Sequence, residues 1–347
     1  MIRAVRLLNA IVNGTTDGAE MQSLLSDAGR LNDWQSLLQF RGQVYRISVS
    51  VNAATAIAGS ALATTSALSV PAVCDALVGN SESLVTKLIV QAAGLSPTAW
   101  STFAGIAADA TVMTAVAASS IAVGFANRSA GAMVAFAAST NAMEKLAASS
   151  AARTAIGFSG IGYSAIAASD MATGKLVLGY AGIAVTTYAS FTLLAANAGH
   201  MATVCANANA CTAAGGSQVA MTAVGGSNTA LAAVFGNSIS KAAIYDATPG
   251  VSGFLGIANA RTYMKTIDSG YATNSTSHVI FSTDLTRVIV TTYGGNTPAS
   301  SVVGRYSDDY ISGAQGAQID LFARITGMTM RSTNSLYAAN VTLINMG

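Results

Sequence analysis

Residues 110–149, ATVMTAVAASSIAVGFANRSAGAMVAFAASTNAMEKLAAS, repeat one short phrase every ten residues. The phrase reads Ser-x-x-Ala-Met-x-x-(Val/Phe/Leu/Ile)-Ala-Ala and returns in a shifted register as GGSQVAMTAVGGSNTALAAVFGNS. A repeat this regular indicates an architecture of stacked units. The serine column that marks its period has six members: Ser119, Ser129, Ser139, Ser149, Ser159 and Ser169.

The spacing inside each ten-residue unit is helical, but the period of ten is not. Met133 and Phe136 are i, i+3 neighbours on one helix face, as are Met143 and Leu146. Over one long helix, however, each repeat would fall about 80° short of three whole turns. We therefore predict one or two helical turns and a tight corner per decad, each decad stacked on the next. A pentapeptide coil is the alternative, and it ranks second because Leu and Phe do not recur at five.

The composition predicts a protein whose surface carries little charge. Of 347 residues, 52% are hydrophobic and only 9% are charged, against roughly a quarter in average proteins. We expect a homo-oligomer, with the trimer as the favoured form, because a partner copy would cover such a surface. The net charge of +2 gives no footprint for nucleic acid. Whether Cys205 and Cys211 pair is left open.

A membrane span is considered because residues 176–240 contain no Asp, Glu, Lys or Arg. The apolar run there continues the decad phrase, is rich in Thr, Ser, Asn and Gly, and lacks basic clusters on its flanks. We therefore predict no membrane span.

Four segments follow from shifts in composition. Residues 1–49 form a helical attachment head, 50–107 hold degenerate repeats, 108–247 form a decad-repeat rod and 248–347 are β-rich. The predicted fold class is α+β: a helical head, a rod of short stacked helical turns, and a C-terminal antiparallel β-sandwich or β-prism. Charge and aromatic residues concentrate in the head, so Trp34, Phe40 and Arg41 are predicted to form its attachment surface.

The sequence offers little catalytic chemistry. His200 and His278 lack nearby metal-ligand patterns, and neither a nucleophile elbow nor a phosphate-binding loop occurs, so we expect no enzyme, no metal and no cofactor. Adjacent acids in a strand point to opposite faces, which is poor geometry for glycan cleavage. The C-terminal polar group is instead predicted to contact a receptor or partner: Arg305, Tyr306, Asp308, Asp309 and Tyr310.

The stretch LLSDAGRLNDWQSLLQFR, followed by VNAATAIAGS and then the tandem decads, resembles virion proteins of tailed bacteriophages of the tail-fibre or baseplate-associated kind. The resemblance covers roughly residues 20–245. It implies an elongated, non-enzymatic virion component, commonly a homotrimer, with one end on the particle and the other presenting a β-domain.

We therefore expect a structural virion fibre, assembled in the host cytoplasm, that binds other virion proteins through its head and a host glycan or protein through its tip. A head or collar fibre differs only in location. A cell-surface adhesin rod is a further alternative. A glycan depolymerase is disfavoured by the scarcity of carboxylates.

Overall fold

The computed structural model describes residues 2–247, 249–250 and 253, together with eight strand segments between residues 265 and 345. Residue contacts divide the chain into two compact units, unit 1 (residues 1–191) and unit 2 (residues 192–347). The predicted α+β class with a β-sandwich or β-prism is wrong. Where the description runs nearly continuously, through residue 253, the chain contains twenty-two α-helices and no strand.

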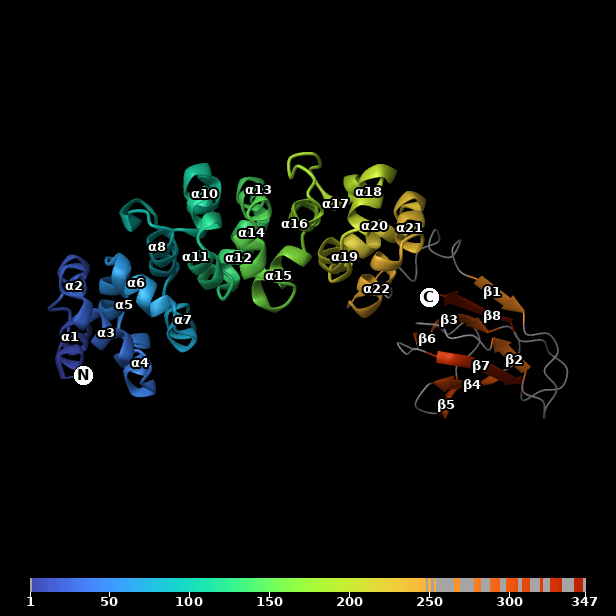
Figure 1. Cartoon of the computed structure of the whole chain (residues 1–347), viewed down its shortest axis with the longest axis horizontal. Helices are drawn as coiled ribbons and strands as arrows, with labels where there is room; N and C mark the ends of the chain where they lie inside the picture. The colour runs from blue at the N-terminus through green and yellow to red at the C-terminus, as the bar shows by residue number, and fades with distance from the viewer. Residues whose placement is uncertain are drawn as a thin grey trace. The chain divides into compact units, whose positions relative to one another are not determined.

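Unit 1 consists of short helices joined by tight corners (Figure 1). Its α-helices are α1 (Ile2–Val12), α2 (Gly18–Leu25), α3 (Ala28–Leu37), α4 (Arg41–Ser48), α5 (Val51–Ala58), α6 (Ala61–Leu68), α7 (Pro71–Leu77), α8 (Glu82–Ala92), α9 (Phe103–Ala108), α10 (Ala110–Ala118), α11 (Ser120–Ala126), α12 (Ala130–Ala138), α13 (Thr140–Ala148), α14 (Ser150–Ile156), α15 (Gly160–Ala167) and α16 (Asp170–Ala181). A 3-10 helix, η1 (Pro97–Ala99), separates α8 from α9.

Helix α17 (Phe191–Ala195) begins at the boundary, and unit 2 continues with α18 (Ala198–Cys205), α19 (Ala208–Gly215), α20 (Gln218–Gly225), α21 (Asn228–Phe235) and α22 (Ser238–Asp246). The strand segments are β1 (Lys265–Asp268), β2 (His278–Phe281), β3 (Val288–Tyr293), β4 (Pro298–Gly304), β5 (Asp308–Ser312), β6 (Ile319–Asp320), β7 (Ile325–Ser332) and β8 (Asn340–Asn345). They pair antiparallel in the orders β1-β8-β3-β6 and β2-β7-β4-β5.

Every serine of the column except Ser159 caps the helix that follows it. Ser139 Oγ accepts a hydrogen bond from the backbone N–H of Ala142 at 3.2 Å, which satisfies one of the donors that a helix start leaves unpaired. The same hydroxyl donates to the carbonyl of Ala107, 32 residues earlier, at 2.8 Å. The donor bond recurs at the same separation from Ser149 to Ala117 and from Ser169 to Ala137. At these corners the serine column therefore marks the helix starts and joins them to an earlier part of the chain.

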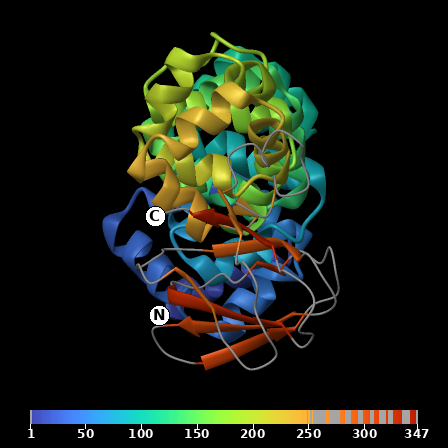
Figure 2. The same ribbon diagram turned by 90° about the vertical axis from the view of Figure 1, so that its right-hand side faces the viewer.

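The separation of 32 residues reveals how the decads stack. Each helix packs against the third helix along the chain, as α10 does on α13, α11 on α14 and α12 on α15. Helices α11 and α12 meet at 105°, so three helices complete about one turn of a coil. Figure 1 shows α10 and α13 side by side, and Figure 2 gives the same ribbon diagram turned by 90°. The prediction that each decad stacks on the next is therefore corrected, because its main partner lies three decads away.

The apolar side chains of the decads form the core. Met133, Phe136, Met143 and Leu146 are fully buried, as predicted, within a single chain. Alanines between them keep the helices close. Isolated helices of seven to nine residues would be marginal in water, so this burial is what stabilises them.

The capped corner also occurs in the predicted head and, with asparagine in place of serine, in the later part of the predicted rod. In the predicted head, Asp17 and Asp27 cap α2 and α3 through their carboxylates, ten residues apart. Helix α3 accordingly begins at Ala28, directly after its cap Asp27. In unit 2, Asn197 and Asn207 cap α18 and α19 in the same way.

Replacing Ser139 by Ala should lower the free energy of unfolding by about 1–3 kcal/mol, because both the cap and the bond to Ala107 are lost. Ser150→Ala is the matched control: Ser150 is an exposed first helical residue, and its change should fall within about 0.5 kcal/mol. Urea denaturation of the two variants measures the difference. Equal midpoints would contradict the role assigned to the serine column.

Two helical glycines should respond oppositely to alanine. A Cβ at Gly179 of α16 would collide with the backbone carbonyl of Ala147 in α13, whereas one at Gly124 of α11 meets nothing within 4 Å. Gly179→Ala should therefore destabilise by about 1–3 kcal/mol through overpacking. Gly124→Ala should stabilise by up to about 1 kcal/mol through helix propensity. Thermal unfolding measures both, and a stabilised Gly179 variant would refute the close approach of α13 and α16.

Candidate functional site

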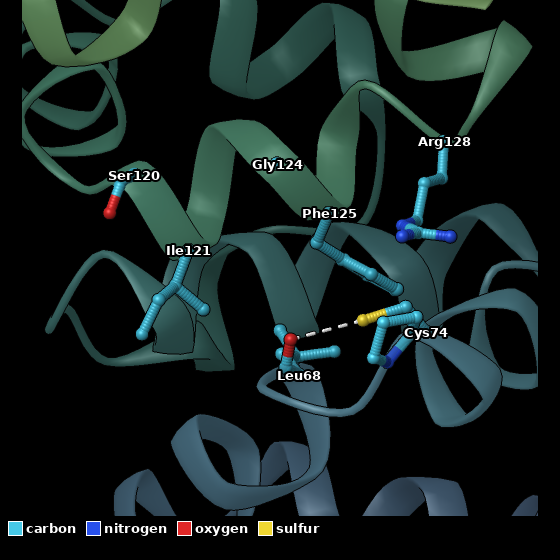
Figure 3. A pocket seen from close by; sticks show the side chains of 8 residues that line it. Leu68, Cys74, Ser120, Ile121, Gly124, Phe125 and Arg128 are labelled. Atoms are coloured by element: carbon cyan, nitrogen blue, oxygen red, sulfur yellow. Dashed lines mark hydrogen bonds between the residues drawn. The ribbon is translucent and has the colours of Figure 1, made fainter. Parts of the chain in front are cut away.

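A hollow of about 240 Å³ opens between the α6–α7 corner and α11, all within unit 1 (Figure 3). Helix α11 supplies one wall, since Ile121, Gly124 and Phe125 follow the i, i+3, i+4 spacing of a single face, and Arg128 lies in the turn that follows the helix. Gly124 carries no side chain, which leaves the space open. The opposite wall is made by Leu68, Pro71 and Cys74.

The base of the hollow is apolar. Phe125 and Cys74 are buried, and the Cys74 thiol donates a hydrogen bond to the Leu68 carbonyl at 3.1 Å (Figure 3). Burial raises the pKa of Cys74 to about 11, and the nearby Arg128 charge only partly offsets this. The thiol is therefore protonated at neutral pH and is a poor nucleophile, so the hollow suits binding better than covalent chemistry.

The rim of the hollow is charged. Arg128 forms an ion pair with Asp75, and their side chains are 37% and 64% exposed. Because both groups reach solvent, the pair contributes little stability, yet it places a guanidinium and a carboxylate beside an apolar space. This site was not predicted from the sequence. The only signal was that the decad of residues 119–128 carries Gly124 and ends on an arginine where its neighbours have alanine.

The three residues predicted for particle attachment differ in their exposure to solvent. Trp34 is fully buried in the core of the first helices, so its side chain has no access to a partner. Phe40 is 47% exposed just before α4, and Arg41 is exposed at its first residue. Further along the same helix, Tyr45 and Val49 are also exposed. Two of the three predicted residues, Phe40 and Arg41, are thus exposed, and the neighbouring exposed residues Tyr45 and Val49 were not predicted.

The predicted C-terminal contact group is described only in part. Asp308, Asp309 and Tyr310 lie in β5, opposite Val303, Val302 and Ser301 of β4. Arg305 and Tyr306 lie outside the described residues, and so do the side chains of β5.

A buried ion pair ties α13 to α16. Lys175 is 2% exposed, and its ammonium donates to Glu144 Oε1 at 2.9 Å and to the Val185 carbonyl at 2.8 Å. The second bond fixes the segment after α16 against the helix. Lys175 is therefore a structural anchor, and its charge depends on Glu144 for compensation.

Cys205 and Cys211 are both free and buried in unit 2. The Cys211 thiol donates to the Val204 carbonyl at 3.2 Å. A hydrogen bond between the two thiols lowers the pKa of Cys205 and raises that of Cys211. They are neighbours in the reduced state.

Among the described residues, no group of three or more His, Cys, Asp or Glu side chains is placed to hold a metal ion. No single helix in that part of the chain is long and apolar enough to cross a membrane. The bent pair α11 and α12, taken together, reaches the required length and apolar composition, and no other feature supports a span there.

The fold of the described helices defines a class: a helical repeat protein with three short capped helices in each turn of its coil. No family model matches the sequence, and no curated protein matches it either.

Replacing Glu144 should destabilise the protein more than replacing Lys175. Glu144→Ala should cost about 3–5 kcal/mol, because it leaves the Lys175 ammonium buried without a counter-charge. Lys175→Met should cost less, because it replaces the buried cation with an apolar side chain and leaves a carboxylate that already reaches solvent. Lys145→Met, beside Glu144, serves as the control and should change stability by under about 0.5 kcal/mol. Urea denaturation measures all three, and the reverse order of Glu144 and Lys175 would contradict this account.

Proposed function

We propose that this chain is a structural component of a bacteriophage virion, a homo-oligomeric tail fibre or baseplate fibre assembled in the host cytoplasm. The observation that carries the proposal is that the characteristic residues of the repeat all serve the structure of the coil. Ser129 and Ser139 cap α12 and α13, Ser139 also joins α13 to an earlier turn, and the Met and the Phe or Leu of both decads are buried in the core. Such a coil spaces its ends and presents surfaces, which is the work of a fibre.

The resemblance of the decad phrase to tail-fibre and baseplate-associated proteins supports the same proposal. A homotrimer is the oligomer that this resemblance implies. The same chemistry is compatible with a head or collar fibre, which differs only in its place on the particle.

Exposed apolar residues support attachment to the particle through the N-terminal helices. Among the described residues, four of the eight large apolar side chains that stand exposed lie in one twelve-residue stretch: Phe40, Tyr45, Val49 and Val51. Concentrations of exposed apolar surface mark interaction sites in soluble proteins. We assign particle contact to Phe40, at the corner before α4.

Particle incorporation tests the proposal. Phe40→Ser should reduce the amount of this protein in purified particles by about tenfold or more, as expected for an apolar anchor at an interface. Val134→Ser, which changes an equally exposed apolar residue on α12, is the control and should be incorporated normally. Circular dichroism checks that both variants keep their helices.

A chain ending at residue 247 should still enter particles but lose host contact. Quantitative immunoblotting of purified particles measures incorporation, and adsorption to host cells measures contact. Normal incorporation of Phe40→Ser together with exclusion of the shortened chain would reverse the proposed polarity. Absence of the wild-type protein from particles would refute the proposed function.

A further inference from the structure

Helix α4 carries an exposed stripe that its own chain does not cover. Arg41, Tyr45 and Val49 follow one another at intervals of four residues and therefore lie along one face. Tyr45 is 69% exposed and Val49 64%, while Val44 and Ile47 on the other side of the helix are buried. We call Arg41, Tyr45 and Val49 the α4 stripe. Phe40 lies one residue before the helix and off this stripe.

The hollow described above has the size and chemistry to receive a side chain of this kind. Its volume, about 240 Å³, lies below the roughly 300–1,000 Å³ typical of small-molecule sites, so it suits an inserted side chain better than a cofactor. Buried apolar pockets with a polar rim that receive Tyr and Arg anchors are where binding energy concentrates at protein interfaces. The base is apolar at Phe125, and the rim carries the exposed Asp75 carboxylate.

We propose that the α4 stripe of one chain docks into the hollow at α6, α7 and α11 of a second copy. Tyr45 would insert toward Phe125, and Arg41, one turn away, would approach the Asp75 carboxylate. Among the described residues, no acidic side chain is recorded in an ion pair with Arg41, and the two exposed charges are opposite in sign. The proposal deepens the homo-oligomer within the proposed function by naming its contact surfaces.

The contact must be made between chains. Tyr45 cannot occupy the hollow of its own chain, because it is largely exposed where it stands. In the proposed arrangement the stripe of each chain enters the hollow of the next, so the contact is heterologous. Such contacts close into rings when the rotation between copies permits, and a trimer is one such ring.

Two variants disrupt the α4 stripe and the hollow separately. Tyr45→Ser removes the inserted side chain from an exposed position. Gly124→Leu fills the hollow from a position where an added Cβ meets nothing within 4 Å. Gly124→Ala adds a side chain too small to fill the hollow and controls for the helix change. Val134→Ser controls for loss of an exposed apolar residue elsewhere.

Light scattering of the full-length chain over a range of concentrations measures self-association. The wild type, Gly124→Ala and Val134→Ser should form the same oligomer. Tyr45→Ser and Gly124→Leu should each dissociate, with a dissociation constant raised about 30-fold or more, as for an interface hot spot. Near-wild-type circular dichroism and thermal unfolding of both variants separate dissociation from misfolding.

Mixing the two defective chains gives the decisive result. Tyr45→Ser keeps an intact hollow and Gly124→Leu keeps an intact stripe, so an equimolar mixture should form 1:1 dimers and nothing larger. A monomeric wild type, undiminished association of either variant, or a mixture that stays monomeric overturns the proposal. Particle incorporation is scored separately, so a chain that enters particles without self-associating refutes this interface and leaves the virion assignment standing.

Discussion

The hydroxyl of the corner serine makes two hydrogen bonds, and the coil of unit 1 depends on both. Ser139 Oγ accepts from an unpaired N–H at the start of α13 and donates to the Ala107 carbonyl near the end of α9. Helix starts leave donors and helix ends leave acceptors without intrahelical partners. One small side chain therefore satisfies an orphan group in each of two helices, and it joins successive turns of the coil in doing so.

These two hydrogen bonds of the serine hydroxyl constrain the spacing of the neighbouring helices. A serine side chain is short, so its hydroxyl reaches a carbonyl of the previous turn of the coil only if the helices lie close together. Alanine supplies that closeness at most positions, and at Gly179 even a Cβ would collide with the backbone of α13. The apolar Met and Phe or Leu of each decad then fill the space inside the coil. Small residues and the fixed period are thus consequences of one requirement, that a corner hydroxyl touch the previous turn.

Local chemistry was predictable from the sequence, and non-local chemistry was not. Capping serines, the Pro71 helix start and the buried Met133 and Phe136 all follow from residue type and spacing. The stacking of each helix on the third along was missed, because nothing inside a decad specifies which neighbour it meets. The corners at Asn197 and Asn207 were missed because only serine was followed, although asparagine caps equally well.

The candidate site was less predictable than the fold for the same reason. The hollow joins residues from α6, α7 and α11, which are separated along the chain by α8, η1, α9 and α10. The ion pair of Lys175 and Glu144 likewise joins residues 31 positions apart. Trp34 was predicted as a contact because aromatic residues anchor interfaces, but an aromatic residue also anchors a core, and the sequence around it does not distinguish the two. The α+β class failed because β-forming residues beyond 248 were given the weight that belongs to the helical repeat before them.

Burial within one chain also changes what the low charge implies. The composition suggested a partner because a monomer seemed bound to expose its apolar residues, yet Met133, Phe136, Met143 and Leu146 are buried by the turns of their own coil. Much of the neutral surface is instead formed by alanine and serine, whose small side chains expose little apolar area to water. The case for self-association therefore rests on specific places and not on overall composition. A coil that completes its own core can add or lose turns without changing its partners, so selectivity must come from departures from the repeat, such as Tyr45 on α4 and the missing side chain at Gly124.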